Sequence, residues 1–224
     1  MKYKLICFDL DGVLVKEKSS WEFIHTHLRV NTNIRLKNID DYSYGKMDYQ
    51  TWVARDIMLW NTSKAKLDLN ELDELFNQVK INEEAEECIN KLKNMNLKIA
   101  IISAGIYELA QKVAKKLGIE IVYANPLPRD THGNIIAKPL ARVVPFAKSR
   151  IISSLAKKMK IPLSNVAYVG DSLWDVSAFR IVGCSIGYKI EPRISEYVNV
   201  IVEDLREIPI VLKMNCRKAY SCNS

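Results

Sequence analysis

The sequence predicts an α/β fold built on a doubly wound parallel sheet, with a small helical domain inserted after the first strand. Short apolar runs alternate with amphipathic helical segments over most of the chain, as expected for parallel strands joined by crossover helices. Several of these runs lead into acidic residues, serine or glycine, the residue types of a ligand crevice at the carboxyl ends of strands. A long segment after the first run shows only helical patterning.

The first strand is predicted over residues 3–8, an apolar run that ends at an acidic pair. The helix predicted at 106–117 stops at Gly118, because glycine readily adopts the left-handed conformation of a helix C-terminus. Two prolines and an Asp-Thr-His-Gly turn make 125–137 a loop or a small hairpin. The other predicted strands are 97–102, 119–124, 166–169, 184–187 and 198–202, and the other predicted helices are 83–95, 146–159 and 173–182.

The chain therefore divides into a core, a helical cap and a tail. Aromatic residues recur in the cap; they are candidates for substrate contact, but we expect most to form the cap's own small core: Trp21, Tyr49, Trp52 and Trp60. The predicted ranges are 1–16 and 80–214 for the core, 17–79 for the cap, and 215–224 for a polar, frayed tail.

Composition narrows the function classes. The 224 residues are 48% hydrophobic and 26% charged, as in ordinary globular proteins. The chain has no apolar run of bilayer-spanning length, and carboxylates interrupt the N-terminal run, so we expect a cytoplasmic protein without a signal peptide or a membrane partner. The net charge of +7 would attract anionic substrates. Lys and Arg are spread along the chain, often at helical spacing with Glu, so no nucleic-acid partner is expected.

The five cysteines are scattered, and the chain has no CxxC pair. Neither a disulfide framework nor a structural zinc site is therefore expected. Cys7 and Cys184 lie in apolar surroundings and are interpreted as small core residues.

Asp9 and Asp11 follow the first predicted strand, and Gly12 comes next. Alternation along an ideal strand would put both carboxylates on one face. One carboxylate can attack phosphorus, while a second protonates the leaving alcohol and later activates water. Gly12 would let the backbone approach a phosphate and donate its amide to a phosphate oxygen. Taken alone, the pattern is equally typical of a calcium loop or an acidic turn.

Two further junctions between strands and helices carry residue types that bind phosphate. Ser103 follows the second strand, where a hydroxyl can join helix amides in binding a phosphate oxygen, although a plain N-cap serine is commoner. Lys148 begins an amphipathic helix, where it would neutralise an aspartate and a phosphate. Lys138, between a Gly-Asn turn and a proline, is the competing candidate, and either lysine taken alone is most simply a surface residue.

Asp171 and Asp175 follow a fourth apolar strand, and at a helix start their spacing would put both acids on one face. Hard oxygen ligands suit Mg²⁺, which needs few carboxylates in addition to water and phosphate. The alternative is a capping aspartate with an unrelated surface aspartate. Because the carboxyl ends of parallel strands meet at one edge, these distant motifs are predicted to converge on one crevice.

In this order the motifs resemble the haloacid dehalogenase (HAD) superfamily of phosphatases. The matching residues are DLDGVLV at 9–15, IISAG at 101–105, Lys148, and YVGDSLWD at 168–175, and the resemblance covers nearly the whole chain. It implies a Rossmann-like HAD core with an inserted cap. It also implies hydrolysis of a small phosphomonoester through an aspartyl-phosphate intermediate, with Mg²⁺ as the cofactor.

The resemblance implies a role for each site residue. Asp9 is the nucleophile and a metal ligand, and Asp11 is the general acid/base that also offers its backbone carbonyl to the metal. Asp171 ligates magnesium, and Asp175 orients the site from behind the ligands. The residues implied to bind the phosphoryl group are Gly12, Ser103, Ala104 and Lys148.

Within the superfamily, the chain is most similar to the phosphoserine phosphatase-like branch, which carries a helical cap between the first two motifs. Those enzymes usually have Ser-Thr where this chain has Gly12-Val13. The glutamate that holds the substrate's amino group would fall at Lys18, next to Glu17, and the arginine that grips its carboxylate would fall near Asp56, next to Arg55. We therefore predict that phosphoserine is not the best substrate.

Other functions fit the same motifs. Phosphoglycolate phosphatases and phosphosugar mutases share them, and a non-catalytic binding protein can be built on the same fold. The intact motifs argue against the non-catalytic alternative, because a binding protein has no need of Asp9. The motifs predict neither the individual substrate nor the oligomeric state.

Overall fold

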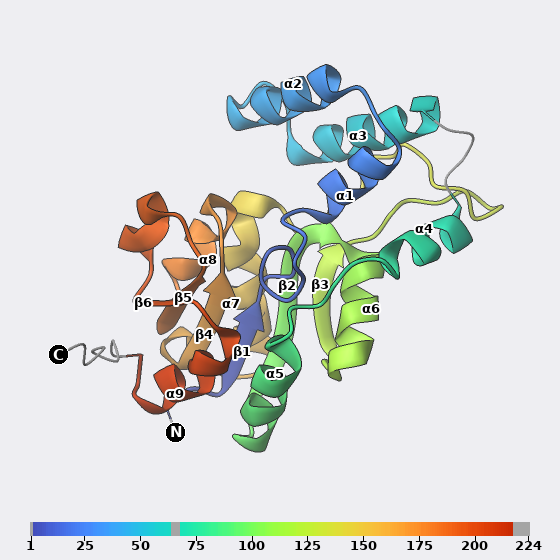
Figure 1. Cartoon of the computed structure of the whole chain (residues 1–224). Helices are drawn as coiled ribbons and strands as arrows, with labels where there is room; N and C mark the ends of the chain where they lie inside the picture. The colour runs from blue at the N-terminus through green and yellow to red at the C-terminus, as the bar shows by residue number, and fades with distance from the viewer. Residues whose placement is uncertain (1, 64–67, 217–224) are drawn as a thin grey trace.

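The computed structural model describes residues 2–63 and 68–216, and in them six parallel strands form one sheet in the order β3-β2-β1-β4-β5-β6 (Figure 1). The chain winds from β1 through β2 to β3, then crosses to β4 and winds the other way. This confirms the predicted doubly wound sheet and puts the switch point between β1 and β4. The strands are β1 (Leu5–Phe8), β2 (Lys98–Ile106), β3 (Ile121–Asn125), β4 (Val166–Gly170), β5 (Cys184–Tyr188) and β6 (Val200–Val202).

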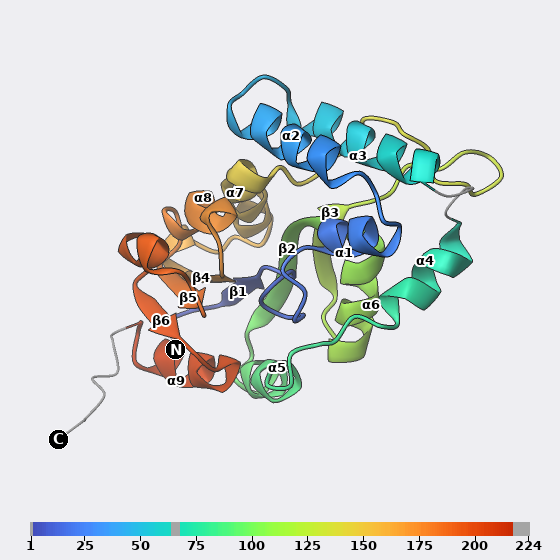
Figure 2. The ribbon, with the colours of Figure 1, turned by 45° about the horizontal axis from the view of Figure 1, so that its top comes forward.

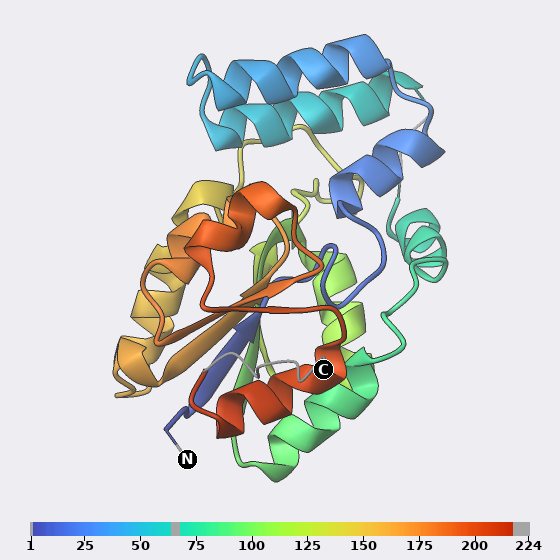
Figure 3. The same ribbon diagram turned by 60° about the vertical axis from the view of Figure 1, so that its left-hand side comes forward.

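Helices cover both faces of the sheet (Figure 3). Burial alternates between the two cores along β1: Leu5 and Cys7 face one core, and Ile6 and Phe8 face the other. A strand without a solvent-facing side is what a parallel sheet covered on both faces requires. The first core contains α7 (Lys148–Lys158) and α8 (Val176–Phe179), and the second contains α5 (Ala85–Asn94), α6 (Tyr107–Leu117) and α9 (Ile208–Lys213).

The segment between β1 and α5 forms four helices, of which the first three lie over the carboxyl ends of the strands (Figures 1 and 2). An isolated antiparallel bridge between Val15 and Ile81 brings the two ends of this segment together. Its last helix lies beside α6, where Lys112 pairs with Asp73 at 2.7 Å. The helices are α1 (Ser20–His27), α2 (Thr32–Ser43), α3 (Tyr49–Ser63) and α4 (Leu69–Phe76). No helix within the described ranges is both long enough and apolar enough to cross a bilayer.

Two predicted elements have different bounds in the structure. β2 continues past the predicted end at 102 to Ile106, with an irregular register against β3. The helix predicted at 173–182 is a 3-10 turn, Leu173–Asp175, followed by the short α8. The turn forms because Ser172 and Asp175 close a capping box, which ties the Asp175 side chain back to the start of the turn.

Helix α9 was not predicted, although the sequence contains a signal for it. Asp204 and Glu207 form a capping box just before the helix, and Pro209 occupies its first turn. Both features favour a helix start. The helix has only six residues, too few for a hydrophobic period to be recognised.

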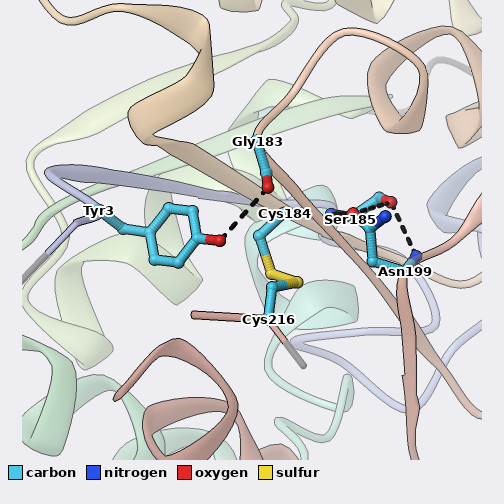
Figure 4. The surroundings of a disulfide bond; sticks show 6 residues. All are labelled: Tyr3, Gly183, Cys184, Ser185, Asn199 and Cys216. Atoms are coloured by element: carbon cyan, nitrogen blue, oxygen red, sulfur yellow. Dashed lines mark hydrogen bonds between the residues drawn. A yellow bond between two sulfur atoms is a disulfide. The ribbon is translucent and has the colours of Figure 1, made fainter. Parts of the chain in front are cut away.

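Cys184 is a buried core residue, as predicted, but the expectation that it takes no part in a disulfide is wrong. This residue, at the start of β5, forms a disulfide with Cys216, 32 positions later (Figure 4). The packing of α9 against the sheet brings the two Cα atoms to 5.7 Å, a proximity that cysteine spacing does not reveal. Cys7 is fully buried and unpaired, as predicted.

The disulfide also holds the first residues of the predicted tail. The backbone N–H of Cys216 donates to the carbonyl of Val211 at 2.9 Å, which continues the end of α9. Beside the disulfide, the Tyr3 hydroxyl donates to the carbonyl of Gly183 at 3.3 Å (Figure 4). The remainder of the tail, 217–224, lies outside the described residues.

Replacement of Cys216 by serine is expected to lower the free energy of unfolding by about 4 kcal/mol, because a cross-link over a loop of this length restricts the unfolded chain. For a chain of this size, the melting temperature should fall by about 10 °C. Thermal denaturation with and without reductant measures the effect, and reduced wild type should melt like the variant. Identical melting of all four samples would show that the bond contributes nothing. Disulfides persist mainly in oxidising compartments and are rare in cytoplasmic proteins. This bond therefore gives no support to the predicted cytoplasmic location, which stays a prediction.

Candidate active site

Asp9 directly follows the last residue of β1, so its carboxylate lies at the carboxyl edge of the sheet. The strand ends at Phe8 and the chain turns at once, so the expectation that Asp9 and Asp11 share a strand face is wrong. The Asp9 backbone N–H donates to the carbonyl of Val169 at 2.9 Å, and its Oδ1 accepts the N–H of Leu10 at 2.7 Å. These two bonds orient a side chain that is buried in the crevice.

Gly12 makes the tight turn after Asp9 possible. Its φ of +72° is strained for residues with a side chain, and a Cβ here would lie 2.2 Å from Oδ2 of Asp171. The Gly12 N–H donates to the carbonyl of Glu17 at 2.7 Å. This bond closes the loop, and the absence of a side chain at Gly12 leaves room for Asp171; the expected amide bond from Gly12 to phosphate stays a prediction.

Lys148, the first residue of α7, is only 1% exposed, and its ammonium bridges two carboxylates. Its Nζ lies 2.7 Å from Oδ2 of Asp9 and 2.6 Å from Oδ1 of Asp175. The Tyr168 hydroxyl donates to the same Asp175 oxygen at 2.6 Å. Lys138, the competing candidate from the sequence, is exposed on the segment after β3.

The titration properties of this group reflect its burial. Burial raises the pKa of Asp9 to about 8, although the nearby Lys148 ammonium acts to lower it. Burial on its own would lower the pKa of Lys148, but the carboxylates of Asp175 and Asp9 outweigh burial and raise that pKa above its usual value. Lys148 therefore remains a cation, held between acidic groups that are buried away from solvent.

Asp171 and Asp175 have different environments, contrary to the expectation of two acids on one helix face. Asp171 precedes the capping residue, and its Oδ2 faces the ammonium of Lys18 at 2.8 Å. Asp175 is fully buried, and its Oδ2 accepts the backbone N–H groups of Asp171 and Ser172, each at 3.1 Å. Since its Oδ1 is taken by Lys148 and Tyr168, Asp175 has both oxygens engaged.

The donor set fits a divalent cation. Asp9, Asp171 and Asp175 can each bring one carboxylate oxygen within 4.8 Å of the others. Burial, followed by the charge of Asp175, raises the pKa of Asp171, so the ionised form of this carboxyl group is disfavoured unless a cation compensates it. Each oxygen of Asp175 accepts at least two hydrogen bonds, whereas each oxygen of Asp9 accepts one and Oδ2 of Asp171 pairs only with the exposed Lys18. Asp9 and Asp171 are therefore the carboxylates with more capacity for a hard cation such as Mg²⁺.

Asp11 lies on the cap side of the site. Its Oδ2 accepts two hydrogen bonds from Ser20 at the start of α1, from the backbone N–H at 3.0 Å and from the hydroxyl at 2.8 Å. Its Oδ1 is buried without a hydrogen-bond partner among the described residues. Burial raises the pKa of Asp11 to about 6, partly offset by the two bonds from Ser20. A carboxyl group that titrates near neutral pH is suited to both acid and base catalysis.

Ser103 lies in the irregular end of β2, the strand next to β1, and is 1% exposed. Its hydroxyl oxygen accepts the N–H of Gly105 at 3.0 Å. The N-cap position of α6 is Ile106, so the alternative interpretation of Ser103 as a plain helix cap is wrong.

The carbonyl of Ala104 fastens the cap to the core. It accepts the indole N–H of Trp21 at 3.1 Å and the hydroxyl of Tyr49 at 2.8 Å. The expectation that most cap aromatics form the cap's own small core fits the buried Trp60, which stacks on Trp21. Tyr49 and Trp21 also bond to the core. The strand end that carries Ser103 is thus also the docking point of the cap.

A cluster of aromatic rings continues this contact between cap and core. Trp52 of α3 lies 6.4 Å, between ring centroids, from Trp174, which follows Asp171 in the core. Tyr42 of α2 lies 6.2 Å from Phe146, which precedes Lys148. Phe146 and Trp174 are 4.6 Å apart. The cap therefore packs directly on the two core loops that supply Lys148 and Asp171.

Three contacts of the site were not anticipated from the sequence. The Tyr168 hydroxyl bonds to Asp175 from within the matched segment at 168–175. The Lys18 contact joins residues 153 positions apart, and the Ser20 contact joins residues nine positions apart, across the turn that follows β1. A polar residue inside an apolar strand run is a signal that would have found Tyr168. No comparable signal exists for Lys18, which is one of many lysines in the chain.

Comparison with known proteins finds phosphoserine phosphatases among both the sequence relatives and the solved structures. The phosphoserine phosphatase of Methanocaldococcus jannaschii is 28% identical over 216 residues, which cover 92% of this chain and 96% of that protein. The phosphoserine phosphatase of Archaeoglobus fulgidus is 24% identical over 214 residues, which cover 94% of this chain but only 60% of that protein. A solved structure described as a phospho-aspartyl intermediate analogue of phosphoserine phosphatase superposes with a TM-score of 0.77 at 27% identity, covering 96% of this chain and 99% of that one.

The family model for haloacid dehalogenase-like hydrolases matches residues 3–183. This range begins just before β1 and ends just before β5, so it includes every strand end and helix start that contributes to the crevice. Since the match covers most of the chain, this protein belongs to the haloacid dehalogenase-like hydrolase family.

Proposed function

We propose that this protein is a magnesium-dependent phosphatase that hydrolyses small phosphomonoesters through an aspartyl-phosphate intermediate on Asp9. The observation that carries the proposal is the buried Lys148 ammonium, 2.7 Å from Asp9 and 2.6 Å from Asp175 at the carboxyl edge of the sheet. A dianionic phosphoryl group and a carboxylate nucleophile repel each other, and cations held between them remove that repulsion. The phosphoserine phosphatases among the relatives support the same reaction class.

In the proposed reaction Asp9 is the nucleophile and Asp11 the general acid/base. A carboxylate oxygen of Asp9 attacks phosphorus, the bond from phosphorus to the ester oxygen breaks, and the leaving alcohol takes a proton from Asp11. A water molecule then attacks the phosphorus of the acyl phosphate and gives a proton back to Asp11. Phosphate departs and the Asp9 carboxylate is restored. Ser20, which holds Oδ2 of Asp11, orients this proton carrier.

The remaining residues hold the phosphoryl group and the cation. Asp9, Asp171 and the backbone carbonyl of Asp11 would hold Mg²⁺, which supplies charge neutralisation and orientation at the phosphoryl group. Ser103, the backbone at Ala104, and Lys148 would bind the phosphoryl oxygens. Asp175 positions Lys148 and, through its bonds to the backbone, the loop of Asp171.

The surroundings of the cap residues support the prediction that phosphoserine is not the best substrate. Asp56 is buried, with its Oδ1 bonded to the Asn38 amide at 3.1 Å and its Oδ2 3.2 Å from Nε2 of His25. Arg55 pairs with Asp41 on the cap surface at 3.7 Å. A zwitterionic substrate needs an acid and a base that are free to turn toward it, and charges left unpaired in a closed site are costly.

The proposed function is tested by phosphate release from a panel of phosphomonoesters that includes phosphoserine, with and without a chelator. Turnover should stop in chelator and return with Mg²⁺, because the carboxylates of Asp9 and Asp171 need a counter-cation. Ca²⁺ should restore less activity, since it tolerates more ligands and a looser geometry. Full activity in chelator would contradict the metal requirement. Isomerisation of phosphosugars without phosphate release would indicate a mutase, and phosphate-ester binding without any turnover a binding protein.

A further inference from the structure

Lys18 puts a second ammonium group at the edge of the carboxylate cluster. Its Nζ lies 2.8 Å from Oδ2 of Asp171. The Lys18 side chain is 67% exposed, whereas the Asp171 side chain is only 7% exposed. An ammonium group has three donors, and this one uses one of them on Asp171 in a setting open to solvent. It therefore retains the capacity to bind a further anion that enters the crevice.

The local chain conformation determines where this ammonium lies. The bond from Gly12 N–H to the Glu17 carbonyl turns the chain back on itself, and a Cβ on Gly12 would lie 3.1 Å from Cδ of Lys18. Ser19 then caps α1, with its hydroxyl oxygen accepting the N–H of Glu22 at 3.2 Å. Lys18 is therefore held between a closed loop and the first turn of a helix, and its stem lies along Gly12.

This position is on the leaving-group side of the site. Ser20, two residues after Lys18, donates both of its hydrogen bonds to Asp11. In the proposed reaction Asp11 protonates the leaving oxygen, so the leaving group faces the segment that joins the core to the cap. An anionic substituent on the leaving group would meet Nζ of Lys18 there.

Glu17 and Asp56 are both less exposed than Lys18. Oε1 of Glu17 lies 3.5 Å from the backbone N–H of Lys80, at the base of the cap, and its Oε2 is buried without a hydrogen-bond partner among the described residues. Asp56 is enclosed in the cap with Asn38 and His25. Lys18 is therefore the more accessible of these charges, and it favours a carboxylate on the leaving group over an ammonium.

We propose that Lys18 is a specificity-determining residue that binds the carboxylate of the leaving group, so that the preferred substrates are phosphate esters of small hydroxy acids. The proposal rests on the phosphatase function proposed above. It adds the charge of the leaving group and the residue that binds it.

Four esters that share the CH₂–O–PO₃ unit test the proposal. The phosphate ester of 3-hydroxypropanoate carries a carboxylate, phosphoethanolamine an ammonium, phosphoserine both groups, and propyl phosphate neither. The 3-hydroxypropanoate ester is expected to have the highest kcat/KM of the four. Highest kcat/KM for phosphoethanolamine, phosphoserine or propyl phosphate would overturn the proposal.

Lys18→Met removes the charge and keeps the length of the side chain. It is expected to lower kcat/KM for the 3-hydroxypropanoate ester about tenfold, as for a charge pair partly screened by solvent, and to change propyl phosphate less than about twofold. Lys16→Met is the matched control, because Lys16 pairs with Glu83 on the surface at 2.7 Å. That variant should leave all four values unchanged.

Loss of Lys18 could also change Mg²⁺ binding, because Lys18 contacts Asp171. Calorimetric titration measures the Mg²⁺ affinity of each variant, and each variant is then assayed at a Mg²⁺ concentration that saturates it. An equal loss on all four esters under those conditions would refute the proposal, since Lys18 would then act only through Asp171. If the wild type hydrolyses none of a wider panel of monoesters in Mg²⁺, the phosphatase function itself fails. Hydrolysis of the four esters without charge preference refutes only the role of Lys18.

Discussion

Asp9→Asn is expected to abolish turnover, with a loss of about 10⁶-fold in kcat, the scale measured when the nucleophile of a covalent-catalysis enzyme is removed. An amide cannot attack phosphorus to form an acyl phosphate. It is also a poorer ligand for a hard cation than a carboxylate. Acid quenching followed by mass analysis should find a phosphoryl group on the peptide that contains Asp9 in the wild type and not in the variant.

The same variant should keep its fold at some cost in stability. In the wild type, Asp9 accepts hydrogen bonds from both Leu10 and Lys148, and one of these donors would face the amide NH₂ of asparagine. A lost buried bond of this kind costs about 1–3 kcal/mol, which thermal denaturation would detect. Asp40→Asn, at an exposed position of α2, is a matched control that should change neither rate nor stability. Substantial phosphate release by purified Asp9→Asn would contradict the covalent mechanism.

Lys148→Met is expected to lower kcat/KM by about 10²- to 10³-fold, the range for removal of one charge-stabilising donor from a reaction centre. The methionine fills most of the lysine's volume, but Asp9 and Asp175 lose the ammonium that lies within 2.7 Å of both. A smaller fraction of Asp9 would then be in the ionised, nucleophilic form, because loss of the Lys148 cation raises the pKa of a buried carboxyl group. Steady-state kinetics with the best ester of the panel measures the loss.

Lys138→Met is the control for this variant, since Lys138 is exposed on the segment after β3. It should leave kcat/KM and the melting temperature near the wild-type values. Because a buried pair broken from one side destabilises by about 3–5 kcal/mol, activity of Lys148→Met should be compared at a temperature where both variants are folded. Loss of activity in Lys138→Met and not in Lys148→Met would move the phosphate-binding lysine to the loop after β3.

The strands at the centre of the sheet were predictable because a strand buried on both faces is a continuous apolar run. The runs at 3–8, 97–102 and 166–169 stand out for this reason, and their order with the intervening helices implies parallel pairing. Helix bounds were less predictable where a helix is too short to show a hydrophobic period and its start is determined by side-chain caps. The short helices α8 and α9 follow capping boxes, and both were misjudged or missed.

The chemistry of the site was predictable to the level of residue type and edge of the sheet. Asp9 and Lys148 are 139 positions apart, yet each lies at a junction of strand and helix, and a parallel sheet brings such junctions to one edge. The direction of each side chain was not predictable in this way. Loop geometry determines the hydrogen-bond partners of the Gly12 amide and of the two Asp175 oxygens. No pattern of residue types predicts that geometry.

The sequence by itself determined the doubly wound sheet, the position of the helical insert and the acidic and basic groups available at the strand ends, because those features follow from local periodicity and chain order. Only the tertiary structure showed that a second lysine, Lys18, also meets those carboxylates. Lys148 and Lys18 reach Asp9 and Asp171 because strands and cap pack together, as Cys184 reaches Cys216 through the packing of α9. Contacts between residues so distant in sequence depend on how every intervening element packs. The residue types at the two positions alone therefore do not predict such a contact.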